Sequence, residues 1–284
     1  MLVLACTGLL LSAASWAQAQ DASAPRRTDV NTRIVGAGGV RQWIDCQGSG
    51  PMTVVVVPGL GTSASAWAKV ADGFRRITRT CFYDRPGLGR SPARAHANEV
   101  VDAGVHAEEL RELLRNAGEG GPYVALGHSY GGLIARAFAR ANGDEVKGVM
   151  LVESVDPAST STSAYWSEAG HLIDMRRSRA ATGGGPPLGS RALMIMGASL
   201  PDRDHLIGPT YGESAAAVRQ WKAQQKGNAR LSTNALWVEA RSGHVVQQDN
   251  PRAVIEGLRE LVAAVIDGSR LVCTPVWLQL QARC

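Results

Sequence analysis

The chain has 284 residues, of which 45% are hydrophobic and 19% are charged, with a formal net charge of +5. At this length one α/β domain can bury a large core. The basic excess contains no patch interleaved with aromatic residues and no nucleic-acid fold signature, so we expect a solvated surface and no nucleic-acid partner.

The beginning of the chain is uncharged over residues 1–19 and is apolar over residues 2–11. It ends in Ala17-Gln-Ala19, so it resembles a secretory signal with a small-x-small cleavage site. The apolar run is too short for a membrane span. We therefore expect an exported protein, periplasmic or secreted, without a stable membrane anchor. Residues 20–32 are expected to be a flexible lead-in, and residues 33–284 the folded domain.

Along the domain, short apolar runs alternate with longer runs of helical character. This alternation predicts a mainly parallel sheet that is covered by helices on both faces, and no repeat period is present. The expected strands include 41–46, 54–57, 80–83, 122–126, 149–152, 193–196 and 237–240, and the expected helices are 98–116, 129–141, 213–225 and 250–266.

A candidate nucleophile lies where one of these strands meets a helix. Residues 127–132 read Gly-His-Ser-Tyr-Gly-Gly, which places Ser129 on a sharp strand-to-helix turn. Such a turn is strained and needs small neighbours, which Gly127 and Gly131 supply. The alternative is a glycine-rich turn after a buried strand, but the strand before and the helix after favour a catalytic serine. A serine hydroxyl is a poor nucleophile by itself and needs a neighbouring base.

The candidate base is His244, in the loop that follows the last expected strand. A histidine at the end of that strand can reach the serine turn. Of the other histidines, His128 lies inside the turn and is expected to point away from the Ser129 site. Four more are on expected helices or polar loops, where we expect solvated side chains: His96, His106, His171 and His205.

These motifs, together with Val54–Gly61 and Tyr83–Ser91, resemble the α/β-hydrolase-fold serine hydrolases over residues 33–267. The resemblance implies the α/β-hydrolase fold: a mainly parallel sheet of about eight strands with helices on both faces. It also implies a short cap at about residues 156–190, with a tail at 268–284. Because the cap is short, we expect it to cover Ser129 only partly, with Tyr165 and Trp166 as walls of a shallow apolar pocket.

The resemblance also assigns an oxyanion hole. Its donors would be the backbone N–H groups of Leu60 and Tyr130. Pro58 stands where the family usually has a histidine. This departure matters little for the hole itself, because backbone groups form it.

Two positions in the sequence could supply the acid of the catalytic triad. The family order of serine, acid and histidine places the acid between residues 129 and 244. Glu153 closes the apolar run at 149–152, whereas Asp202 and Asp204 follow the run at 193–196. Most of the superfamily uses the later position, but Asp202 comes unusually late after that strand. Glu153 is therefore slightly favoured, and its alternative role is a carboxylate hydrogen-bonded near a strand end.

Removal of the signal takes away Cys6 and leaves four cysteines. An even number in an exported protein suggests disulfide bonds. In the family the strand at 41–46 runs antiparallel beside the strand at 80–83, which implies the pairs Cys46–Cys81 and Cys273–Cys284. No Cys-x-x-Cys or His-Glu-x-x-His is present, so we expect no metal site and no cofactor.

The resemblance therefore implies a carboxylic-ester hydrolase that acts on a small-molecule ester, with Ser129, Glu153 and His244 as its triad. One alternative is an amidase or peptidase that uses the same triad. Another is a non-catalytic binding protein that retains the fold, but the presence of both Ser129 and His244 argues against it. The sequence does not specify acyl length or oligomeric state.

Overall fold

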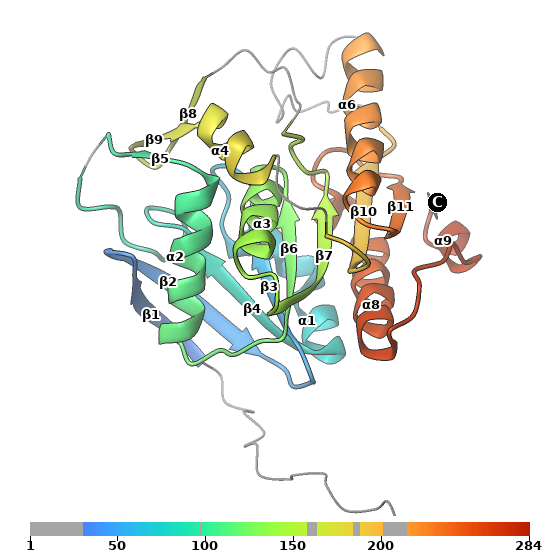
Figure 1. Ribbon diagram of the computed structural model, residues 1–284, viewed down its shortest axis with the longest axis horizontal. Helices are drawn as coiled ribbons and strands as arrows, with labels where there is room; N and C mark the ends of the chain where they lie inside the picture. Colours follow the sequence, from blue (N-terminus) through green and yellow to red (C-terminus); the bar gives the residue numbers. More distant parts are fainter. Residues whose placement is uncertain (1–30, 97, 158–163, 184–187, 201–214) are drawn as a thin grey trace, which may run out of the picture.

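The computed structural model of the protein describes residues 31–96, 98–157, 164–183, 188–200 and 215–284. The expected signal segment, most of the lead-in, Asp202, Asp204 and His205 lie outside the described residues. Figure 1 shows a central sheet with helices packed on both of its faces.

The described part of the sheet has nine strands in the order β1-β2-β4-β3-β6-β7-β10-β11-β12. The pairings from β4 to β11 are parallel, whereas β1–β2, β2–β4 and β11–β12 are antiparallel. The expected mainly parallel sheet is confirmed. Its strands are β1 Asn31–Ala37, β2 Val40–Gln47, β3 Thr53–Val57, β4 Arg79–Asp84, β6 Tyr123–His128, β7 Val146–Val152, β10 Ala192–Ala198, β11 Asn234–Ala240 and β12 Ala282–Arg283.

Some of the helices begin where a polar side chain binds free backbone N–H groups, as Asp102, Asp174 and Asn250 do. Asp102 accepts from Gly104 and Val105, so the helix expected from residue 98 begins only at Ala103. The helices are α1 Ala68–Ile77, α2 Ala103–Asn116, α3 Tyr130–Ala141, α4 Met175–Thr182, α6 Ala215–Gly227, α7 Val246–Asp249, α8 Pro251–Asp267 and α9 Val276–Gln279, with 3-10 turns at Ala64–Trp67 and Asn228–Leu231.

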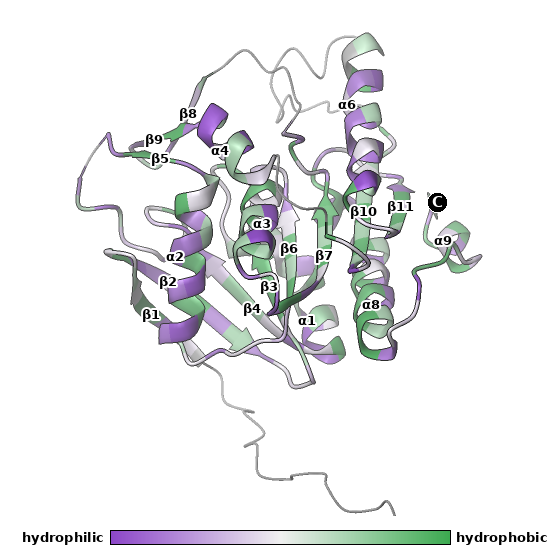
Figure 2. Cartoon of the chain, viewed as in Figure 1, coloured by the Kyte–Doolittle hydropathy of each residue, from purple (hydrophilic) through white to green (hydrophobic). Residues whose placement is uncertain are grey.

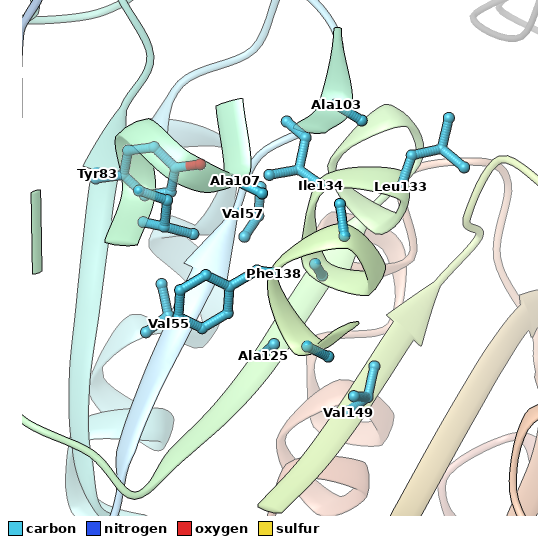
Figure 3. Packing of buried hydrophobic residues seen from close by; sticks show 14 of the residues in the cluster. Val55, Val57, Tyr83, Ala103, Ala107, Ala125, Leu133, Ile134, Phe138 and Val149 are labelled. Carbon is cyan, nitrogen blue, oxygen red and sulfur yellow. The ribbon is translucent and has the colours of Figure 1, made fainter. Parts of the chain in front are cut away.

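Two hydrophobic clusters lie on opposite faces of the sheet, under α2 and α3 on one face and under α1 and α8 on the other. Val55 and Val57 of β3 belong to the first cluster, and Val54 and Val56 to the second. This explains why the apolar run at residues 54–57 is uninterrupted, since a central parallel strand is buried on both sides. Figure 2 shows hydrophobic residues in green along β7 and hydrophilic residues in purple on α2 and α4. Figure 3 shows Phe138 of α3 among residues of the sheet.

After β7 the chain forms a cap with its own small sheet. β8 Tyr165–Glu168 and β9 His171–Asp174 form an antiparallel hairpin, and β9 also pairs with β5 Val100–Val101. Helix α4 follows the hairpin directly (Figure 1). The sequence predicted a cap here but not its hairpin, because a four-residue strand leaves little periodic signal.

The structure joins Cys46 to Cys81 and Cys273 to Cys284, which is the expected pairing. Cys46 and Cys81 are register partners on β2 and β4. In the described part of the chain, no helix has the length and apolar character needed to cross a bilayer.

Candidate active site

Ser129 lies between β6 and α3 with φ 51° and ψ −122°, a backbone conformation that is unfavourable for a residue with a side chain. Neighbouring backbone leaves no room for larger residues on either side. A Cβ on Gly131 would lie 2.3 Å from the carbonyl oxygen of Val57, and one on Gly127 would lie 2.3 Å from that of Gly131. The Gly-x-Ser-x-Gly spacing is therefore a steric requirement of this turn.

The structure brings His244 and Glu153 together at the same edge of the sheet. Both side chains are buried, and His244 Nδ1 lies 3.8 Å from Glu153 Oε2. This distance is too long for a hydrogen bond. Among the described residues, His244 Nδ1 has no hydrogen-bond partner, and no hydrogen bond joins His244 to Ser129 Oγ. Catalytic hydrogen bonds often tighten only when substrate binds. The alternative acids, Asp202 and Asp204, lie outside the described residues.

The carboxylate of Glu153 is held from two sides. Its Oε1 accepts from the N–H of Ala198 at the end of β10, and its Oε2 accepts from Nε1 of Trp221 on α6. These bonds fix the carboxylate in front of the His244 ring, whose centroid lies 6.1 Å from that of Trp221. Sequence reasoning missed Trp221. Its only signal was a single tryptophan in the otherwise small and polar run of α6.

His128 supports the loop that carries His244. Its Nε2 lies 2.9 Å from the carbonyl oxygen of His244. A carbonyl only accepts, so Nε2 donates. Burial, together with the nearby His244, lowers the pKa of His128 to about 3, which keeps the ring neutral at physiological pH.

Two backbone N–H groups lie close to the serine turn. Tyr130 is the first residue of α3, so its N–H has no acceptor within the helix, and the helix terminus carries partial positive charge. Leu60 follows Gly59, which packs directly on the turn: a Cβ on Gly59 would lie 3.3 Å from Ser129 Cβ. These are the two N–H groups that the sequence resemblance implied.

Comparison with known proteins agrees with this architecture. A family described as alpha/beta hydrolase fold matches residues 53–183. An esterase structure from Thermogutta terrifontis superimposes with a TM-score of 0.60 over 82% of this chain and 98% of its own, at 17% identity. The chain has the α/β-hydrolase fold.

Curated relatives of this α/β-hydrolase-fold chain include a protein of unassigned function and a lipase. The uncharacterized protein YqjL of Bacillus subtilis is 28% identical over 73% of this chain and 82% of its own length. Lipase LipV of Mycobacterium tuberculosis is 37% identical over 39% of each chain, so the match spans well under half of that lipase.

Two histidines of the hydrolase fold differ from expectation. His106 and His171 were expected to be solvated, and this is wrong: each is only 2% exposed. His171 lies on the cap strand β9 and its ring centroid lies 6.0 Å from that of His106 on α2. His106 Nδ1 lies 3.0 Å from the hydroxyl of Tyr130. Burial, with the positive charges of Arg85 and Arg94, holds the pKa of His106 well below its ordinary value. The expectation was wrong because the cap hairpin packs onto α2 and buries both rings where the two elements meet. His96 is exposed, as expected.

One side-chain cluster has the composition of a metal site. Ligand atoms of His106, Glu168 and His171 lie within 4.8 Å of one another. However, the Glu168 carboxylate is already bound by the guanidinium of Arg85. That positive charge opposes a second cation, so the cluster is a poor fit to a metal ion.

The expected pocket walls differ in burial. The ring centroid of Trp166 lies 6.2 Å from that of Tyr130, and its side chain is half-buried. Tyr165 is 46% exposed. Ser129 itself is only 8% exposed. Of the two cap aromatics, Trp166 is therefore the one placed to contact a substrate near the serine turn.

Proposed function

We propose that this α/β hydrolase is a serine hydrolase that cleaves carboxylic esters through an acyl-enzyme intermediate. The single observation that carries the proposal is the strained backbone of Ser129, φ 51°. Strain of this kind persists only where the surrounding structure enforces it. Here it lifts a hydroxyl to the sheet edge where His244 and Glu153 meet. The similarity to a lipase and to an esterase fold supports hydrolase chemistry.

In the proposed reaction, Ser129 Oγ attacks the ester carbonyl carbon while His244 takes its proton. The N–H groups of Leu60 and Tyr130 stabilise the oxyanion of the tetrahedral intermediate. His244 then protonates the leaving alcohol, and the C–O bond breaks. A water molecule, deprotonated by His244, attacks the acyl carbon. The bond from that carbon to Ser129 Oγ then breaks, His244 returns the proton to Oγ, and the acid leaves. Glu153 orients the imidazole and stabilises its protonated form.

The test is covalent labelling of the active serine. The wild-type protein should react with a fluorophosphonate probe and hydrolyse an activated aryl ester, because only an activated serine does both. Ser129→Ala should abolish both, and His244→Ala should lower turnover by several orders of magnitude. Ser65→Ala, at an exposed serine of the 3-10 turn, is the matched control. Retention of more than about a tenth of the rate in Ser129→Ala would exclude the assignment.

We propose also that the protein is exported. The support is the uncharged, apolar segment at residues 1–19 and the pairing of four cysteines in two disulfides. Disulfides of this kind persist in oxidising compartments. Terminal sequencing of the protein recovered from outside the cytoplasm should begin after Ala19; recovery of the intact chain from the cytoplasm alone would contradict export.

A further inference from the structure

A buried ion pair links the cap to the body of the domain. Glu168 ends β8 of the cap hairpin, and Arg85 follows β4, 83 positions earlier in the chain. Their side chains are 0% and 1% exposed. Arg85 donates through Nε to Oε2 at 2.9 Å and through Nη2 to Oε1 at 2.6 Å. This two-point geometry is directional and strong.

The same two side chains hold the loop after β3. Arg85 donates to the carbonyl oxygens of Pro58 and Gly59, each at 2.6 Å. The N–H of Gly61 donates to Glu168 Oε1 at 2.7 Å. The backbone on both sides of Leu60 is thus fixed, and among the described residues the Leu60 N–H has no acceptor. That leaves this N–H free for a substrate oxygen.

Arg85 also contacts the second proposed oxyanion residue. Its guanidinium carbon lies 5.6 Å from the ring centroid of Tyr130. The hairpin tip is itself packed against the body: a Cβ on Gly87 would lie 2.6 Å from that of Ala169. The N–H of Asn98 donates to the carbonyl of Gly170 at 2.9 Å. The tip therefore has little freedom to carry Glu168 away from the loop.

Both members of the pair are charged. Burial alone raises the pKa of Glu168, but the charge and hydrogen bonds of Arg85, with the Gly61 N–H, outweigh it and lower the pKa below its ordinary value. Burial opposes the charge on Arg85, yet Glu168 outweighs it and raises the pKa of Arg85. Loss of either partner would leave an uncompensated charge inside the protein.

We propose that Glu168 is a positioning residue, through which the cap hairpin sets the geometry of the oxyanion loop at residues 58–61. This inference rests on the proposed function, since it concerns the same oxyanion hole. An oxyanion forms only along the reaction path, so a displaced Leu60 N–H should weaken the transition state more than substrate binding. The cap would then contribute to catalysis and not only to substrate contact.

The test compares Glu168→Gln with a matched variant, Glu119→Gln. Glu119 forms an equally short, buried, two-point pair with Arg79 at the other end of β4. Both variants lose the charge on a buried carboxylate, but only the first touches the oxyanion loop. For an activated aryl ester, Glu168→Gln should lower kcat about 10- to 100-fold with KM changed by less than about threefold, and Glu119→Gln should leave kcat within about twofold.

A second readout does not depend on turnover. Hydrogen exchange of the peptide covering residues 58–62 should accelerate in Glu168→Gln and stay as in the wild type in Glu119→Gln. If Glu168→Gln does not fold, Arg85→Lys replaces it, because lysine keeps the charge but loses the two-point geometry. Unchanged kcat, or unchanged exchange at residues 58–62, in the variant used would overturn the proposal.

The two proposals fail separately. If the wild type shows no Ser129-dependent turnover, the proposed function is wrong, and the exchange comparison alone decides whether Glu168 holds the loop. If turnover depends on Ser129 but Glu168→Gln behaves as Glu119→Gln does, the positioning role is wrong and the serine chemistry stands.

Discussion

The imidazole of His128 holds the backbone of His244, with Nε2 2.9 Å from the carbonyl oxygen and ring centroids 4.8 Å apart. His128 directly precedes Ser129, whereas His244 lies on the loop after β11. One hydrogen bond therefore connects the turn that carries the proposed nucleophile to the loop that carries the proposed base. Trp67, fully buried, packs edge-on against the His128 ring with centroids 6.3 Å apart, which restrains it from the other side.

Replacement of His128 should consequently impair turnover through the position of His244. His128→Phe keeps a ring but removes the hydrogen-bond donor. We expect kcat for an activated aryl ester to fall about 10- to 100-fold, because displacing a catalytic group by about 1 Å can lower the rate by that much. His128→Gln, whose amide N–H can occupy the place of Nε2, should retain most of the rate. Steady-state kinetics of both purified variants is the measurement, and equal losses in the two would argue against the hydrogen bond.

Buried neutral histidines should make the protein less stable in acid. The pKa of His128 is lowered to about 3 by burial and by His244, so below the ordinary histidine pKa of about 6.5 the unfolded chain binds a proton that the folded protein does not. Stability is therefore lost as the pH falls through this window. From pH 7 to pH 5, His128 alone should cost about 2 kcal/mol of unfolding free energy.

Denaturant unfolding at these two pH values isolates that effect when the wild type is compared with His128→Gln. The difference in unfolding free energy between the two proteins should decrease by about 2 kcal/mol on acidification. A difference that does not change with pH would show that His128 is protonated in the folded state or is accessible to solvent. Other titrating groups cancel in this comparison.

The acid of the triad can be distinguished by amide substitution. Glu153→Gln should lower kcat by about a hundredfold or more, because a neutral amide cannot stabilise the protonated imidazole of His244. Asp202→Asn and Asp204→Asn are the matched controls and should stay near the wild-type rate. A larger loss in either aspartate variant than in Glu153→Gln would transfer the role to the loop after β10.

The four paired cysteines should be unreactive in the native protein. Mass mapping of nonreduced peptides should join Cys46 to Cys81 and Cys273 to Cys284. The bonds span 35 and 11 positions, and their removal as Cys46→Ala/Cys81→Ala or Cys273→Ala/Cys284→Ala should cost about 4 and about 3 kcal/mol of unfolding free energy, respectively. Labelling of any of the four by a thiol reagent without denaturant would contradict this pairing.

Substrate preference should follow from the shallow apolar pocket that the sequence predicts beside Ser129. A panel of p-nitrophenyl esters from acetyl to palmitoyl should give the highest kcat/KM at short to medium chains, with weak discrimination, since one methylene in an apolar pocket is worth ~1–3 kcal/mol at most. Matched anilides should react more slowly. Trp166→Ala should alter the chain-length profile, whereas Tyr165→Ala, at the more exposed neighbour, should not.

A rate that rises steeply to the longest chains would indicate a lipase-like tunnel, and anilides cleaved as fast as esters would indicate a peptidase.

Much of this molecule could be predicted from local sequence. The alternation of apolar and helical runs gave the strands and helices because a central parallel strand is buried on both faces and a covering helix on one. Ser129 could be recognised because its turn needs small residues at fixed spacing, and the backbone contacts of Gly127 and Gly131 show why. The proposed base, His244, follows from its place after the last long strand.

Other features are decided only by the tertiary structure. The partners of Glu153 and of Arg85 lie 68 and 83 positions away along the chain, on a helix and a cap hairpin whose local patterns do not indicate them. His106 and His171 became buried because the cap hairpin, which carries His171, packs onto α2, which carries His106, and the two ring centroids lie 6.0 Å apart. Local sequence specifies the backbone conformation of each helix and strand, and the side of that element that faces the core. Which distant side chains then meet depends on how those elements pack, and in this protein that packing positions the carboxylate facing His244 and the loop over Ser129.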